Sequence, residues 1–75
     1  MVETRRTIIN AIGRNVRRER LRLGLSQEKL AFAADLHPNY VGFVERGERS
    51  ITVVNLVKLA KALKVPAYRL FKGLI

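Results

Sequence analysis

The sequence predicts an all-α domain in which five short helices pack as one compact bundle. Three observations favour this fold class. Apolar residues recur three and four positions apart along most of the chain, as they do on one face of a helix. No segment alternates apolar and polar residues like a half-buried strand, and glycine, proline and small polar residues separate the apolar runs. The 75 residues suffice for one small domain, so we expect residues 1–75 to form a single unit.

The first expected helix runs from Ile8 to Leu23. Thr7 is its candidate N-cap, and Gly24 is a typical C-terminal stop. One stripe of this helix is apolar, and most of its arginines lie off that stripe; the stripe consists of Ile9, Ile12, Val16 and Leu23. We expect residues 1–6, ahead of the helix, to be disordered.

The second and third expected helices are short and joined by a tight turn. Ser26 can cap a helix from Gln27 to Ala34, and residues 35–36 then turn the chain. The third helix is expected from Pro38 to Arg46, because a proline in the first helical turn loses little from its missing N–H. Gly47 ends it.

The last two expected helices follow a loop. Thr52 can cap a helix from Val53 to Leu63, whose apolar residues have a clear 3.6-residue period. Val65 precedes a proline and so disfavours the helical conformation, which breaks the chain there. A short fifth helix is expected from Ala67 to Lys72, ending at a glycine.

The charge favours a polyanionic partner. Fifteen Lys and Arg against six Asp and Glu give a net charge of +9, which is typical of a nucleic-acid-binding domain. The alternative is a solvated basic surface. A membrane role is not expected, because the apolar runs are too short to span a bilayer and the apolar face of residues 53–64 is better explained as core.

Several other classes are disfavoured by composition. The chain has no cysteine and no signal-peptide-like start, so we expect a cytoplasmic, nucleoid-associated protein without disulfides. His37 is the single histidine and has no cysteine or carboxylate cluster around it, so no metal site is expected. Neither a glycine-rich phosphate loop nor a nucleophile–base pairing is visible. We therefore expect no enzymatic activity, no cofactor and no small-molecule ligand.

The run SQEKLAFAADLHPNYVGFVERG, residues 26–47, has the spacing of a helix-turn-helix. In its second helix Val41 and Val44 recur three apart and are expected to face the core. Asn39, Tyr40, Gly42 and Phe43 are then left facing outward. A second helix with a polar and aromatic outer face can enter a DNA major groove.

The chain also resembles the Cro and phage-repressor-type (lambda-repressor-like, xenobiotic-response-element-like) helix-turn-helix regulators over about residues 12–73. VRRERLRLGLSQEKLA is similar to the first two helices of phage repressors, and YVGFVERGERSITVVNLVKLAKALKV is more similar still to restriction-modification controller proteins. The family features are Arg20, Gly24, Leu25, Ser26, Gln27, Leu30, Ala31, Glu45, Gly47, Leu56, Ala60 and Leu63. Three positions depart from the family pattern. Asp35 stands where glycine is common in the turn, and His37 stands where Ser or Thr usually caps the third helix. Pro38 stands where the family often has a polar residue that contacts DNA.

The resemblance implies two roles away from the bases. Arg20 and Glu45 would form a largely buried ion pair between the first and third helices, for which the planar guanidinium is well suited. Gln27 would contact a phosphate, the alternative being an ordinary solvated first-turn glutamine.

The residues themselves suggest the DNA contacts of the third helix. Asn39 can pair bidentately with adenine, and Phe43 can contact a thymine methyl or fold back onto the scaffold. Tyr40 can reach a phosphate or a thymine methyl, or pack against the second helix. Arg46 and Arg49 lie where a DNA backbone would pass, with a solvated pair of arginines as the alternative.

One reading helix covers only a few base pairs, so we expect a homodimer on a near-palindromic operator with half-sites about 34 Å apart. The expected interface consists of Val65, Leu70, Phe71, Leu74 and Ile75, and the alternative uses Val54 and Val57. We expect a transcriptional regulator that binds double-stranded DNA sequence-specifically, and a restriction-modification controller protein is the first choice. The alternatives are a phage-type repressor, or an antitoxin or adaptor module that binds a protein partner through the same fold.

Overall fold

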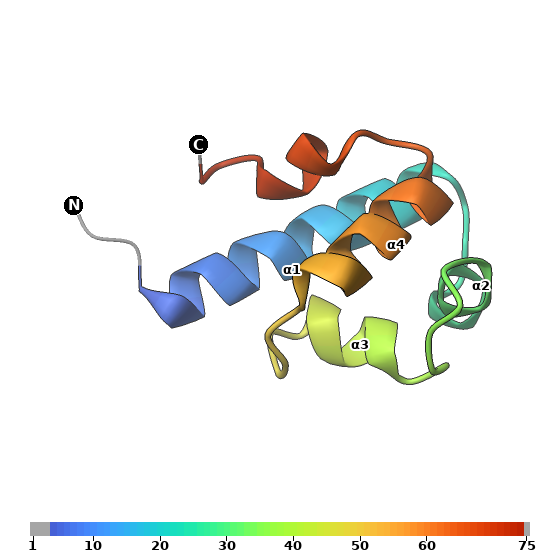
Figure 1. Ribbon diagram of the computed structural model, residues 1–75, viewed down its shortest axis with the longest axis horizontal. Coiled ribbons are helices and arrows are strands. Elements are labelled where there is room, and N and C mark those ends of the chain that lie inside the picture. Colours follow the sequence, from blue (N-terminus) through green and yellow to red (C-terminus); the bar gives the residue numbers. More distant parts are fainter. Residues whose placement is uncertain (1–3, 75) are drawn as a thin grey trace.

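The structure, a computed structural model, describes residues 4–74 and is all-helical over that range (Figure 1). Its elements are α1 (Arg5–Arg22), α2 (Gln27–Ala33), α3 (Tyr40–Glu45), α4 (Val53–Leu63) and the 3-10 helix η1 (Ala67–Phe71). The all-α class is confirmed. Of the five helices expected, four are α-helices within residues 4–74. The short fifth, expected from Ala67 to Lys72, is a 3-10 helix that ends at Phe71.

Helix α1 begins one turn earlier than expected. The Thr4 hydroxyl accepts a hydrogen bond from the Thr7 N–H at 3.1 Å, so Thr4 is the N-cap and Thr7 lies inside the helix. Arg5 and Arg6, expected in a disordered segment, are therefore helical. Residues 1–3, the rest of that expected segment, lie outside the described residues. The helix ends as expected before Gly24.

The turn between α2 and α3 is longer than expected. Helix α3 begins at Tyr40, and Pro38 and Asn39 belong to the turn rather than to the first helical residues. The Asn39 N–H donates to Nδ1 of His37 at 3.1 Å, so this histidine satisfies a backbone group just ahead of α3. Asp35 follows α2 with a φ of 58°, the left-handed conformation that a glycine would adopt more easily.

Helix α4 has the predicted bounds and cap. The Thr52 hydroxyl accepts from the Asn55 N–H at 3.0 Å, and the helix ends at Leu63 with Lys64 in the left-handed conformation. The core gathers apolar side chains from every element: Ile12, Val16, Leu30, Ala31, Ala34, Val41, Val44, Leu56, Leu59, Ala60, Leu63 and Leu70. It is continuous across the four α-helices and η1, so each short helix is held by packing rather than by its own length.

Helix α1 is the central helix of the fold and packs against α3 on one side and η1 on the other (Figure 1). The approach of α1 to α3 is close at Gly13, where an added Cβ would collide with the Val44 carbonyl oxygen. On the other side, the Asn15 amide donates to the carbonyls of Leu70 and Lys72 at 2.8 and 2.9 Å. These two bonds attach the end of η1 and the residue after it to α1.

None of the helices in the described range is both long and apolar enough to cross a membrane. Residues 4–74 also contain no group of three His, Cys, Asp or Glu side chains placed to hold a metal ion.

Candidate nucleic-acid interface

The outer face of α3 and the first turn of α2 together form a shallow groove of about 540 Å³. It is lined by Arg20, Ser26, Gln27, Glu28, Pro38, Asn39, Gly42, Phe43 and Arg46. Val41 and Val44 are fully buried beneath it, as their three-residue spacing predicted. The groove therefore brings Gln27, Asn39, Phe43 and Arg46 to one surface from two helices and a turn.

Gln27 is held in this groove by a hydrogen bond. Its side-chain amide donates to Oε1 of Glu45 at 3.1 Å, which links α2 to α3. Gly42 leaves the room for this arrangement, because an added Cβ would lie 2.9 Å from Arg46 Nη1 and 3.2 Å from Gln27 Oε1. Gly42, expected to be open to solvent on the outer face, is buried under these two side chains.

Phe43 lies among basic side chains on the outer face. The guanidinium carbon of Arg49 is 4.9 Å from the ring centroid and that of Arg46 is 5.3 Å from it. Both distances suit cation–π attraction, which at exposed sites contributes about 0.5–1 kcal/mol. Arg46 also pairs with the half-exposed Glu48 at 3.1 Å. The ring thus orients two arginines at the end of α3.

Tyr40 and Asn39 lie beside Phe43. They line a second hollow of about 240 Å³ together with His37, Phe43 and Arg49. Asn39 is exposed and its side chain makes no capping hydrogen bond. Tyr40 is half-buried and packs against the core, so its ring serves the scaffold as well as the surface. Arg49 borders this hollow although it follows α3 in sequence.

Arg20 and Glu45 form a bidentate ion pair beneath the groove. Arg20 Nε and Nη2 donate to the two carboxylate oxygens at 2.6 and 2.9 Å, and Nη1 donates to the Leu25 carbonyl at 2.9 Å. The side chains are 8% and 3% exposed. The hydrogen bond to Glu45 raises the pKa of Arg20 and outweighs the opposing effect of burial. This pair and the Gln27 bond connect α1, α2 and α3.

A second buried carboxylate was not anticipated from the sequence. Glu19 is 3% exposed and pairs with Arg22 at 2.8 Å, Arg18 at 3.4 Å and Arg69 at 3.6 Å. Burial acts to raise its pKa, but the hydrogen bonds from Arg22 and Arg18 and the charges of Arg69 and Arg22 together outweigh burial, so the pKa of Glu19 is lowered. Glu19 and Arg22 stand three apart, a spacing visible in the sequence. The contact with Arg69 requires the fold.

The apolar surface differs from the expected pairing surface. Leu70 is fully buried in the core, so it is not available to a partner as expected. Val65, Phe71 and Leu74 are partly buried against the same core, and Ile75 lies outside the described residues. The exposed apolar side chains of α4 are instead Val53, Val54 and Val57, at 80%, 64% and 39% exposure.

Several known proteins are similar to this chain in sequence and fold. The helix-turn-helix family profile matches residues 16–70. Control protein C.BamHI of Bacillus amyloliquefaciens is 48% identical over 54 residues, covering 71% of this chain and 67% of its own. Control protein C.SmaI of Serratia marcescens is 46% identical over 59 residues, covering 79% and 70%. The crystal structure of the restriction-modification controller protein C.AhdI from Aeromonas hydrophila superposes with a TM-score of 0.82 at 46% identity, over 84% of this chain and 96% of that one.

Proposed function

The chain belongs to the helix-turn-helix family, and from that premise we propose that it is a transcriptional regulator of the restriction-modification controller type. Two relatives are named as control proteins and a similar crystal structure as a restriction-modification controller protein. These are regulators rather than enzymes. The expectation that this chain is not an enzyme agrees with them.

The observation that carries the proposal is the groove between α2 and α3. Asn39 offers an amide that matches the edge of adenine in the major groove. Arg46 lines the groove, and both Arg46 and Arg49 lie over the Phe43 ring, where they can approach phosphates. Gln27 lies beside Arg46 over Gly42 and is held by a hydrogen bond to Glu45. The groove thus combines a group for base recognition with cations for the DNA backbone.

The reading helix is short and rigidly supported. Helix α3 has six residues, so its contacts span only a few base pairs. We therefore infer that the protein acts as a homodimer on a near-palindromic operator, with half-sites about one helical turn apart. The exposed valines of α4 support a pairing surface there. Phe71 and Leu74 of the expected C-terminal surface are partly buried against the core and form the alternative pairing surface.

Selection from a pool of random duplexes tests the proposal. The expected product is a near-palindromic site bound with a strong salt dependence, since each neutralised phosphate contributes about −0.9 to the slope of log K against log salt. The net charge of +9 per chain supports several contacts in each half-site. Failure to enrich any sequence, together with a flat salt response, would refute DNA binding as the function.

A further inference from the structure

We propose that a notch formed by Arg5, Arg6, Arg49 and Ser50 binds a backbone phosphate of the DNA strand that flanks the bases read by α3. The inference rests on the proposed function and extends it to a part of the chain outside the helix-turn-helix. The first turn of α1 and the loop after α3 build the notch, which has a volume of about 350 Å³. Its lining is Arg5, Arg6, Ile9, Gly47, Glu48, Arg49 and Ser50.

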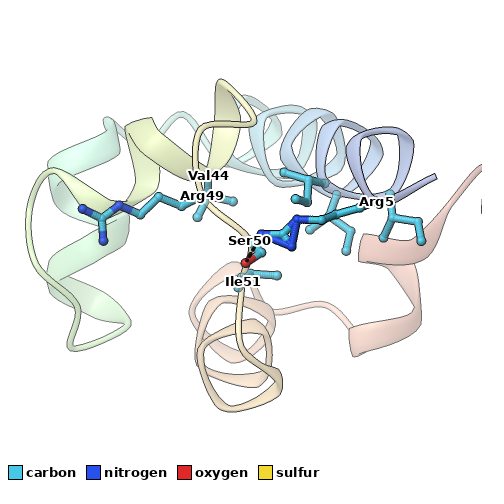
Figure 2. A pocket seen from close by; sticks show the side chains of 8 residues that line it. Arg5, Val44, Arg49, Ser50 and Ile51 are labelled. Carbon is cyan, nitrogen blue, oxygen red and sulfur yellow. Dashed lines mark hydrogen bonds between the residues drawn. The ribbon is translucent and has the colours of Figure 1, made fainter.

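The two sides of the notch are joined across the fold. Arg5 Nη2 donates to the Ser50 hydroxyl at 3.4 Å, as the dashed line in Figure 2 marks. Figure 2 shows the neighbouring apolar hollow, with Ser50 and Ile51 facing the Arg5 side chain while Arg49 extends away from them. That hollow, about 260 Å³, shares Arg5, Arg49 and Ser50 with the notch. Arg5 thus reaches across from α1 to the loop.

A close backbone approach holds the loop against α1. Gly47 has a φ of +71°, a conformation that side chains other than glycine rarely adopt. An added Cβ there would also collide with the side-chain oxygen of Asn10 on α1. A larger residue at position 47 would therefore push the loop away from α1 and open the notch. The glycine keeps the loop that carries Arg49 and Ser50 against the turn of α1 that carries Arg5, although the two segments are far apart in sequence.

The charges of the notch favour an anion. Within residues 4–74, none of Arg5, Arg6 and Arg49 forms an ion pair with a carboxylate. Glu48 is the one acid in the lining, and its carboxylate is paired with Arg46 at 3.1 Å. Guanidinium groups match phosphate oxygens with paired hydrogen bonds. A phosphate in the notch would accept hydrogen bonds from the Arg5 and Arg6 guanidinium groups and from the Ser50 hydroxyl.

The position of Arg5 and Arg6 does not favour the helix that carries them. The first turn of α1 contains no acidic residue, and these two cations lie at its N-terminal end. The helix dipole disfavours positive charge at that end. An anion bound between these arginines and the loop would interact favourably with both the arginines and the dipole.

Arg49 connects the notch to the surface that faces DNA. Its guanidinium lies over the Phe43 ring, and it lines the hollow that contains Asn39 and Tyr40. A duplex with its major groove over α3 would carry one strand past Arg49 and onto the notch. The bound group is then a phosphate next to the recognised bases rather than one of the bases themselves, so the interaction would add affinity without changing base preference.

The test compares two double variants that remove the same charge. Arg5→Ala/Arg6→Ala removes the two α1 cations that line the notch. Arg14→Ala/Lys61→Ala removes two exposed cations elsewhere on α1 and α4. For the notch variant we expect operator affinity to fall about tenfold. The salt slope should become shallower by about 0.9 for each phosphate that the variant no longer neutralises. Selected base preference should stay that of wild type, and the melting temperature should not fall. The control variant should keep nearly the wild-type affinity and slope.

Neutral methylphosphonate groups at single flanking positions identify the phosphate. One substitution should weaken wild-type binding and have no effect on Arg5→Ala/Arg6→Ala. Competition by millimolar inorganic phosphate should leave operator binding unchanged, whereas displacement would assign the notch to free phosphate and overturn the inference. Equal affinities and slopes of the notch and control variants would also overturn it. That outcome leaves the proposed function intact, whereas absence of wild-type binding to any duplex would refute the function itself.

Discussion

The Arg20 guanidinium and the Glu45 carboxylate meet in a bidentate pair at 2.6 and 2.9 Å across 25 residues of chain. Oε1 of Glu45 also accepts the Gln27 amide, so one carboxylate takes bonds from both α1 and α2. Because Glu45 is the last residue of α3, these bonds determine where the reading helix ends relative to the scaffold. The pair thereby links stability to the orientation of the DNA-facing surface.

Removing Glu45 should destabilise the domain severely. Glu45→Ala leaves Arg20 buried without its partner, which costs about 3–5 kcal/mol for a buried pair. That approaches the whole free energy of unfolding of a small domain. Thermal melting measures the effect. Glu48→Ala is the matched control, because its carboxylate is half-exposed and its pair with Arg46 should contribute little. Melting of Glu45→Ala within a degree or two of wild type would show the pair to be unimportant.

The lowered pKa of Glu19 predicts an acid-sensitive step in stability. A carboxyl whose pKa is lower in the folded chain than in the unfolded chain stabilises the fold while it is ionised. This stability is present above the ordinary value of 4.5 and is lost as the pH falls below it through the folded value. Urea unfolding at a series of pH values should show the loss.

Glu19→Gln should be less stable than wild type at neutral pH and should lose less stability on acidification below pH 4.5. The substitution removes the charge that pairs with Arg22, Arg18 and Arg69. Glu28→Gln changes an exposed acid and should keep the acid dependence of wild type. Parallel stability–pH curves for Glu19→Gln and wild type would contradict the role assigned to Glu19.

Base recognition should depend on Asn39 and Phe43. Asn39→Ala should cost about 1–3 kcal/mol of binding free energy and relax preference at one base pair of each half-site. Phe43→Ala should relax preference as well, because it removes an aromatic contact to a base. It also releases Arg46 and Arg49, which should lower the affinity for all sequences. Arg46→Ala should weaken all sequences alike. Site selection with each variant measures preference. If both Asn39→Ala and Phe43→Ala select the same sequence as wild type, the assignment of α3 as the reading helix is wrong.

Dimer formation should depend on the exposed valines of α4. Val54→Asp/Val57→Asp places charge on an apolar surface that is 64% and 39% exposed in the single chain. We expect a monomer by sedimentation and a loss of cooperative operator binding. Phe32→Asp on α2 is the control, since Phe32 is 88% exposed and lies on a different element. It should remain a dimer.

A chain truncated after Lys72 separates the two candidate surfaces. It lacks Leu74 and Ile75 of the expected C-terminal interface. A dimer in the truncated chain and a monomer in Val54→Asp/Val57→Asp would assign the interface to α4. The reverse pattern would restore the C-terminal interface and reject the one on α4.

The sequence by itself determined the all-α class of the fold and the local features around the candidate interface. Local chemistry is sufficient for this: Ser26 and Thr52 cap their helices through their own hydroxyls, and the spacing of Val41 and Val44 places them in the core. The bounds of α4 agree with the residues predicted. These features depend on interactions between residues a few positions apart.

Tertiary structure alone decided what depends on contacts between distant segments. Asn15 donates to the carbonyls of Leu70 and Lys72, which ties the end of the last element to α1, and Leu70 is buried in the core. Glu19 forms an ion pair with Arg69, and Arg5 in the first turn of α1 donates a hydrogen bond to Ser50. Periodicity and capping are local, whereas the free energy of these contacts exists only once the packed helices have brought the two partners together.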